Sequence, residues 1–142
     1  MNRTIVMLIT LVIIFGCMKE DNDFDTKRNN ISGTWEVTQA TQEIRADTVS
    51  QERSTTFEIT FNIDGTGIKQ TFLDTEQEFQ WLYQYNPEKV IISADQSGIQ
   101  LSSAQIYEII KNENQRQIWE FEVILIGQPV DKYKHTWKMD KK

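Results

Sequence analysis

Residues 55–63 read TTFEITFNI, and this stretch decides the fold class. Every second residue in it is apolar, namely Phe57, Ile59, Phe61 and Ile63. A period of two places these side chains on one face of a β-strand and the intervening polar ones on the other. Asp64-Gly65 follows directly, and this dipeptide favours the positive φ angles of a tight hairpin turn. The stretch therefore predicts a half-buried strand that leads into a hairpin.

The same alternation recurs along the rest of the chain from residue 32, and no convincing amphipathic helix pattern accompanies it. Residues 99–111 are apolar on both faces in places, so they form either one long bent strand or two short ones. The other strands expected from the pattern are 33–39, 68–73, 76–85, 89–94, 116–126 and 130–139. Together these segments predict a meander of about eight strands.

A meander of this length is most stable when it closes on itself, because closure removes both unpaired edges. The sequence therefore predicts an all-β fold, an eight-stranded antiparallel up-and-down β-barrel. An open two-layer β-sandwich is the alternative. The polar residues 41–54 are expected to form a loop over the mouth of the barrel.

The first sixteen residues have the composition of an export signal. Arg3 supplies a positive charge, and the eleven residues from Ile5 to Phe15 are apolar except for Thr10. As a helix, eleven residues are about 16 Å long, roughly half of a bilayer core. A signal peptide is therefore predicted rather than a membrane-spanning helix.

Ile14-Phe15-Gly16-Cys17 resembles the lipobox of bacterial lipoproteins. The resemblance implies cleavage before Cys17 and acylation of its thiol and its new amino group. Each buried methylene contributes about 0.8 kcal/mol, so several acyl chains would hold the protein at a membrane. The alternative is an ordinary secretory signal that leaves Cys17 as a free thiol.

Residues 17–30 are expected to form a solvated acidic tether, because they are rich in charge and poor in apolar side chains. Their beginning, Met18 to Asp23, resembles the acidic sorting signal of surface lipoproteins in one group of Gram-negative bacteria. A spacer that faces the periplasm is the alternative. The expected organisation is a signal peptide over 1–16, a tether over 17–30 and a barrel over 31–142, with the protein anchored at the outer membrane.

The segment Ile31-Ser32-Gly33-Thr34-Trp35 carries a Gly-x-Trp motif that resembles the first strand of lipocalins. The stretches at 64–67 and 81–83 resemble turn and strand motifs of small lipocalin-like lipoproteins of Gram-negative bacteria. The likeness covers residues 31–142 and implies a lipocalin-like barrel in which Gly33 and Trp35 are structural, with Trp35 closing one end. Lipocalins also place a C-terminal arginine over this tryptophan. Here the cations nearby are Lys138, Lys141 and Lys142.

The charge of the mature chain excludes nucleic acid as an expected partner. Removing residues 1–16 takes away one basic residue, which leaves 14 basic against 21 acidic residues and a formal charge of −7. Such a surface repels phosphate backbones, and the sequence contains no basic stripe.

Few residues in the chain offer reactive chemistry. His135 is the one histidine, and the sequence contains no nucleophile elbow and no phosphate-binding glycine loop. A lone histidine on an inward strand face is usually a packed, hydrogen-bonded residue, so no catalytic residue, cofactor or metal site is expected. Glu120 and Glu122 are expected to form ion pairs with Lys132 and Lys134 across strands.

Large aromatic side chains on the expected inward face are the remaining functional signal. A small eight-stranded barrel either fills its interior with side chains or keeps a cavity for one ligand, and both remain open here. The candidate ligand-contacting residues are Trp81, Tyr83, Trp119, Phe121, Tyr133 and Trp137. Rings of this kind contact apolar ligands or stack on sugars.

Two functions follow as hypotheses. The first is a lipid-anchored envelope protein whose barrel binds a small apolar, amphiphilic or glycan ligand. The second is a packed barrel that acts as a protein-interaction or structural module at the envelope. Separately, Asp47-Thr48-Val49 resembles the Asp-Thr-apolar site at which some of these bacteria attach O-glycans to exported proteins, which makes Thr48 a candidate.

Overall fold

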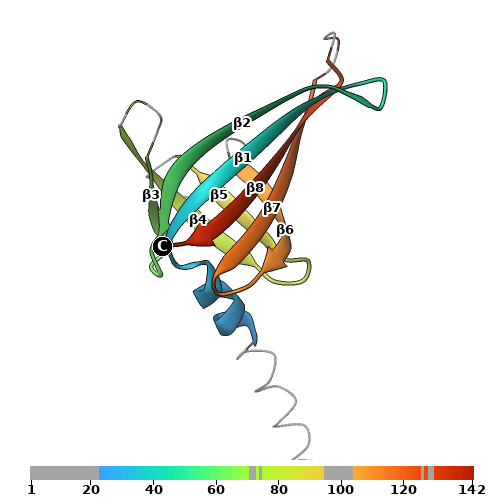
Figure 1. Ribbon diagram of the computed structural model, residues 1–142. Helices are drawn as coiled ribbons and strands as arrows, with labels where there is room; N and C mark the ends of the chain where they lie inside the picture. Colours follow the sequence, from blue (N-terminus) through green and yellow to red (C-terminus); the bar gives the residue numbers. More distant parts are fainter. Residues whose placement is uncertain (1–22, 71–72, 74, 95–103, 126, 128–129) are drawn as a thin grey trace, which may run out of the picture.

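The computed structural model of the protein describes residues 23–70, 73, 75–94, 104–125, 127 and 130–142. Its eight strands form one closed barrel, in which each strand pairs antiparallel with the next and β8 pairs with β1. The strands are β1 (Gly33–Arg45), β2 (Thr48–Phe61), β3 (Thr66–Gln70), β4 (Glu76–Gln84), β5 (Lys89–Ser93), β6 (Gln105–Asn112), β7 (Arg116–Ile124) and β8 (Lys132–Lys141) (Figure 1). The predicted eight-stranded antiparallel up-and-down barrel is confirmed, and the sandwich alternative is wrong.

The first hairpin is longer than the sequence pattern predicts. Residues 41–45 and 48–54 are paired strand, so the predicted loop over 41–54 is wrong. Ala46 and Asp47 alone form the turn, with φ angles of 46° and 59°. Positive φ at both central residues is what a two-residue hairpin turn requires. Residues 41–44 also pair with β8, and most side chains along 41–54 are polar on both faces, so a hydrophobicity pattern does not reveal these strands.

The turn between β2 and β3 occupies the predicted place but has a longer form. The backbone N–H of Gly65 donates to the carbonyl of Asn62 over 3.1 Å, and Gly65 has a φ of 91°. Residues 63–65 therefore form a three-residue loop with glycine at its left-handed position. The carboxylate of Asp64 accepts hydrogen bonds from the hydroxyl and the backbone N–H of Thr66, which lowers the pKa of Asp64.

A helix at residues 23–31 packs against the barrel end at which β1 begins (Figure 1). Phe24 and Ile31 are seven residues apart and therefore lie on one helix face. The Phe24 ring lies 5.3 Å from the ring of Tyr83, and Ile31 is completely buried. Lys27 forms a 3.5 Å ion pair with Glu88. The expectation of a solvated tether is thus wrong for residues 23–30, because two apolar side chains at helical spacing suffice to dock this segment.

The densest part of the core lies next to this helix. Phe61 is at its centre, with ring centroids 5.4 Å from Phe79, 5.5 Å from Trp81 and 5.3 Å from Trp119, all in edge-to-face geometry. Each such aromatic pair contributes about 0.5–1.5 kcal/mol beyond its buried area. This half of the barrel interior is filled by side chains.

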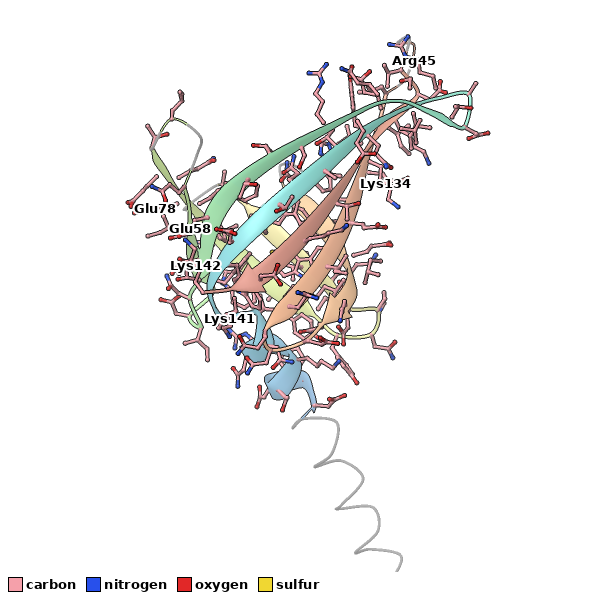
Figure 2. The ribbon with its side chains drawn as sticks, in the orientation of Figure 1. Arg45, Glu58, Glu78, Lys134, Lys141 and Lys142 are labelled. Carbon is pink, nitrogen blue, oxygen red and sulfur yellow. The ribbon has the colours of Figure 1, made fainter. Side chains whose placement is uncertain are left out.

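Trp35 lies at the helix end of the barrel, near the start of β1. Its side chain is completely buried. The ammonium group of Lys141 lies 5.2 Å from its ring centroid. Gly33 has a φ of 125°, and a Cβ atom there would lie 2.7 Å from Cε of Lys141. Figure 2 shows Lys141 and Lys142 at this end and Arg45 at the far tip of the first hairpin.

The outer face carries the predicted ion pairs. Lys132 Nζ lies 3.2 Å from a carboxylate oxygen of Glu122, and Lys134 Nζ lies 2.9 Å from one of Glu120. These pairs are partly exposed, and such pairs contribute at most about 1 kcal/mol each. No helix in the described part of the chain combines the length and the apolar character needed to cross a bilayer.

Candidate functional site

A cavity of about 220 Å³ lies inside the barrel, toward the end remote from the helix. Its apolar lining comes from Ile59, Phe79, Ile92, Ala94, Tyr107 and Trp137, and its polar lining from Lys69, Gln77 and Gln105. Strands β2, β3, β4, β5, β6 and β8 all contribute. For comparison, a dry cavity of about 150 Å³ in another protein binds benzene, so this space suits a ligand of one or two rings.

The strand register explains why these side chains meet. Ile59 on β2 lies directly opposite Lys69 on β3, which lies opposite Gln77 on β4. Directly opposite residues of antiparallel strands point to the same face, so all three face the interior. Gly67 precedes this row on β3. A Cβ atom there would lie 2.2 Å from Cζ of Phe79, so glycine makes the room that the Phe79 ring occupies.

Lys69 is the charged group of the cavity. Its Nζ lies 4.3 Å from the ring centroid of Phe57 and 5.5 Å from that of Trp137. Burial lowers the pKa of Lys69. Among the residues that the structure describes, no carboxylate oxygen lies within 4.0 Å of this ammonium group. The cation therefore faces aromatic rings and side-chain amides.

Hydrogen bonds fix the two largest rings of the lining. Trp137 Nε1 donates to Oε1 of Gln39 over 2.7 Å, and the Tyr107 hydroxyl donates to Oε1 of Gln105 over 2.7 Å. The two rings lie 4.5 Å apart. Burial raises the pKa of Tyr107, so its hydroxyl stays protonated and acts as a donor. The arrangement is a wall of hydrogen-bonded aromatic rings beside an ammonium group.

A polar network continues from Gln39 toward the end of the barrel that is remote from the helix. Thr41 Oγ1 lies 3.0 Å from Nδ1 of His135, and Gln39 Nε2 donates to Thr41 Oγ1 over 3.2 Å. The imidazole stacks on Phe121, with ring centroids 4.3 Å apart. Burial lowers the pKa of His135. This histidine is stacked on Phe121 and hydrogen-bonded to Thr41.

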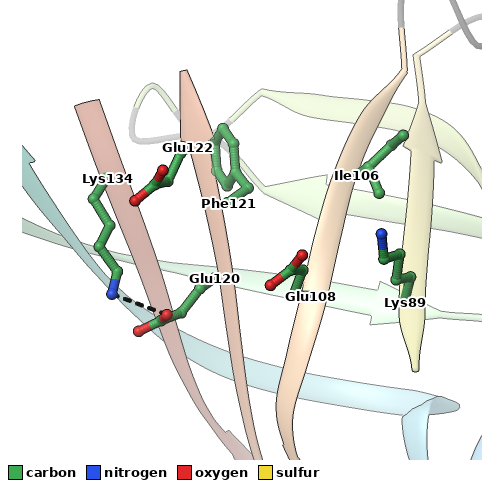
Figure 3. A pocket seen from close by; sticks show the side chains of 7 residues that line it. All are labelled: Lys89, Ile106, Glu108, Glu120, Phe121, Glu122 and Lys134. Atoms are coloured by element: carbon green, nitrogen blue, oxygen red, sulfur yellow. Dashed lines mark ion pairs between the residues drawn. The ribbon is translucent and has the colours of Figure 1, made fainter. Parts of the chain in front are cut away.

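A second hollow of about 340 Å³ lies on the barrel wall between β6 and β7 (Figure 3). The ladder between these strands ends at the pair Glu108–Glu120, and beyond it the strands separate. Phe121 lies at this opening, with Glu122 and the ion pair of Lys134 and Glu120 around it. Lysine and glutamate side chains surround the hollow, so this seam between β6 and β7 is polar and is not an apolar ligand pocket.

The six aromatic candidates from the sequence do not converge on one site. Trp137 lines the 220 Å³ cavity. Trp81 and Trp119 belong to the packed core, and Tyr83 packs against the helix through Phe24. Phe121 lines the seam between β6 and β7, whereas Tyr133 lines a separate groove beside His135.

The remaining sequence candidates are Cys17 and Thr48. Cys17 and the signal segment 1–16 lie outside the described residues. Thr48 is exposed at the tip of the β1–β2 hairpin, where its hydroxyl lies 3.4 Å from the carbonyl oxygen of Ala46. In the described part of the chain, no three metal-ligating side chains group together.

Lys69, Tyr107 and Gln39 are site residues that the sequence analysis missed. Lys69 stands between Ile68 and Gln70, and this local pattern gives no sign that the lysine faces inward. The usable signal is Gly67, because a glycine inside a strand marks a close approach of another group. Lys69 lies two residues after Gly67 and therefore on the same face of β3.

Comparison with known proteins finds no matching family model, no matching curated protein and no matching solved structure. The fold and the geometry of the cavity therefore carry the functional argument.

Proposed function

We propose that this protein is a lipid-anchored envelope lipoprotein whose barrel binds a small apolar or amphiphilic ligand in its interior. The supporting observation is the 220 Å³ cavity, with rings of Phe79, Tyr107 and Trp137 in its lining. Concave, mostly apolar spaces with a few polar groups are the usual form of small-molecule sites. A barrel interior filled throughout would leave no such space.

The lining suggests a ligand with an apolar body and a polar end. The aromatic rings bury the body, while Lys69, Gln77 and Gln105 offer hydrogen bonds to the other end. A ligand with one or two rings at ordinary ligand efficiency binds with a Kd on the order of 10 to 100 µM.

The proposed anchor orients the cavity. Five residues separate Cys17 from the helix start at Asp23, and an extended chain spans about 3.5 Å per residue. Acyl chains on Cys17 would thus keep the helix end of the barrel within about 20 Å of the membrane. The cavity lies toward the other end of the barrel, so this anchor would place it on the side away from the bilayer.

The test is a calorimetric titration with 2-naphthamide, a neutral two-ring probe. Ala94 lines the cavity at an exposed position, so Ala94→Trp fills the space without disturbing the core. Thr38→Trp is the matched control, because Thr38 is exposed on the outside of β1. We expect saturable binding to the wild type and to Thr38→Trp, and none to Ala94→Trp. Binding that is equal in all three proteins would place the probe elsewhere and refute a cavity ligand.

A second candidate function rests on an apolar row on the outer face. Leu82, Ile91 and Ile106 lie directly opposite one another across β4, β5 and β6. Leu82 is 51% exposed and Ile106 is 45% exposed, whereas Ile91 between them is 7% exposed. Exposed apolar patches mark interaction surfaces, which supports the alternative of a protein-interaction module at the envelope. That role predicts loss of a specific cross-link in intact cells when Leu82 and Ile106 are replaced by glutamate, with probe binding unchanged.

A further inference from the structure

We propose that the ligand of the barrel cavity is a small monoacid, and that Lys69 binds its acidic group. The inference rests on the proposed function, which supplies a ligand, and it adds the chemical class of that ligand. Lys69 is the residue that turns an apolar cavity into an anion-selective one.

The position of the ammonium group is the first step. Nζ of Lys69 lies 4.3 Å from the ring centroid of Phe57 and 5.5 Å from that of Trp137, and these two rings contact each other edge to face. Ring faces stabilise a cation by about 0.5 to 2 kcal/mol. A ring face accepts hydrogen bonds less well than an oxygen does, and the described residues place no carboxylate oxygen within 4.0 Å of this ammonium group. A partly buried cation without a carboxylate partner is costly, and an anionic ligand removes that cost.

The surroundings of Lys69 are the second step. The side chains opposite it in the ladder are Ile59 and Gln77, which are both uncharged. Within the described residues the cavity lining contains no carboxylate, although the chain as a whole carries a net charge of −6. The described cavity is thus a locally positive site inside an acidic protein. The acidic outer surface repels anions in general, so selection of an anion depends on this one group.

The size and charge of the site limit the ligand. One lysine balances one negative charge, which favours a carboxylate over a doubly charged phosphate ester. A volume of 220 Å³ holds one or two rings or a short branched chain. The rings of Trp137 and Tyr107 are held by hydrogen bonds, so they present a fixed surface to the apolar body.

The experiment compares two probes of the same shape, 2-naphthoate and 2-naphthamide, by calorimetry at neutral pH. The acid carries a carboxylate where the amide is neutral. A charge-assisted hydrogen bond at Lys69 makes the wild type bind the acid roughly 10- to 100-fold more tightly than the amide. Lys69→Met keeps the aliphatic stem and removes the charge, so it should reduce that ratio to about one.

Two further variants control for side effects. Lys138→Met removes a lysine that is exposed on the outside of β8, and it should retain the preference for the acid. Lys69→Arg keeps the charge and should retain a preference for the acid even if Lys69→Met folds poorly.

Each alternative result has a distinct meaning. If the wild type binds both probes equally, the proposed acid selectivity is wrong while a cavity ligand stands. If Lys69→Met keeps the preference for the acid, Lys69 is not the group that binds the carboxylate, and the inference is wrong while a cavity ligand stands. If neither probe binds, the proposed function itself fails, and this inference fails with it.

Discussion

Nε1 of Trp35 donates a 2.7 Å hydrogen bond to the backbone carbonyl of Ile31, and this bond joins the N-terminal helix to the first strand. Both side chains are completely buried. Because a buried indole N–H needs a partner, the last residue of the helix is part of the barrel core. The helix is therefore a closing element of the fold rather than a piece of linker.

Replacing Ile31 with alanine should lower the free energy of unfolding by about 2 to 4 kcal/mol, because it leaves a cavity between the helix and the barrel. Urea unfolding followed by tryptophan fluorescence measures this. Ile110→Ala is the matched control, since Ile110 is 58% exposed, and it should change stability by less than about 0.5 kcal/mol. Equal effects of the two substitutions would show that the helix does not support the barrel.

Gly67→Ala should destabilise the barrel by about 1 to 3 kcal/mol through overpacking. The new Cβ atom would meet the Phe79 ring at 2.2 Å and the Thr60 carbonyl oxygen at 2.6 Å. Phe79→Leu removes the first clash and not the second, so the cost of Gly67→Ala should be smaller in that background. Urea unfolding of all four proteins gives the interaction energy, expected at about 0.5 kcal/mol or more. Strict additivity would mean that glycine is not needed for the Phe79 ring.

His135 should make the barrel less stable in mildly acidic solution. Burial lowers its pKa below the ordinary 6.5, so the unfolded chain binds the proton more readily than the folded one. The free energy of unfolding should therefore fall as the pH drops from 6.5 toward the lowered pKa. His135→Gln keeps a polar partner for Thr41 and should flatten this dependence. Urea unfolding near pH 7 and pH 5 measures it, and an unchanged slope in the variant would assign the effect to other groups.

Lys69→Met should stabilise the free protein at neutral pH. Burial lowers the pKa of Lys69 below 10.5, so folding disfavours its charged form. The unfolded chain holds the proton more tightly, and stability should rise with pH from the lowered pKa up to 10.5. The advantage of the variant should thus shrink near pH 10. Thermal unfolding at both pH values measures it, and a variant that is less stable at neutral pH would show that the cation has a stabilising partner.

Cys17→Ser should release the protein from the envelope, because serine cannot take the thioether-linked lipid. Fractionation of intact cells followed by immunoblotting gives the distribution. Asn22→Ser is the control, since it lies outside the lipobox and should remain with the membrane fraction. A serine variant that still sediments with envelopes would refute the lipid anchor.

The alternation of residues 57–63 and its recurrence along the chain were enough to predict strands and a closed barrel. An apolar residue at every second position indicates that one face of the strand is buried. The same reasoning failed over 41–54. Most side chains on both faces of that hairpin are polar, and its strand state depends on backbone pairing with β8 and between its own two arms. The docked helix at 23–31 was missed because its two apolar residues stand among charged ones.

Sequence alone determined the class of the fold, the aromatic content of its interior and the paired charges of its outer face, since these follow from local periodicity and residue type. Tertiary structure decided which rings fill the core and which line a cavity, and it placed Lys69 inside. The reason is register. A shift of one residue exchanges the two faces of a strand, and only the closed ladder of eight strands, with Gly67 leaving room for Phe79, fixes that choice.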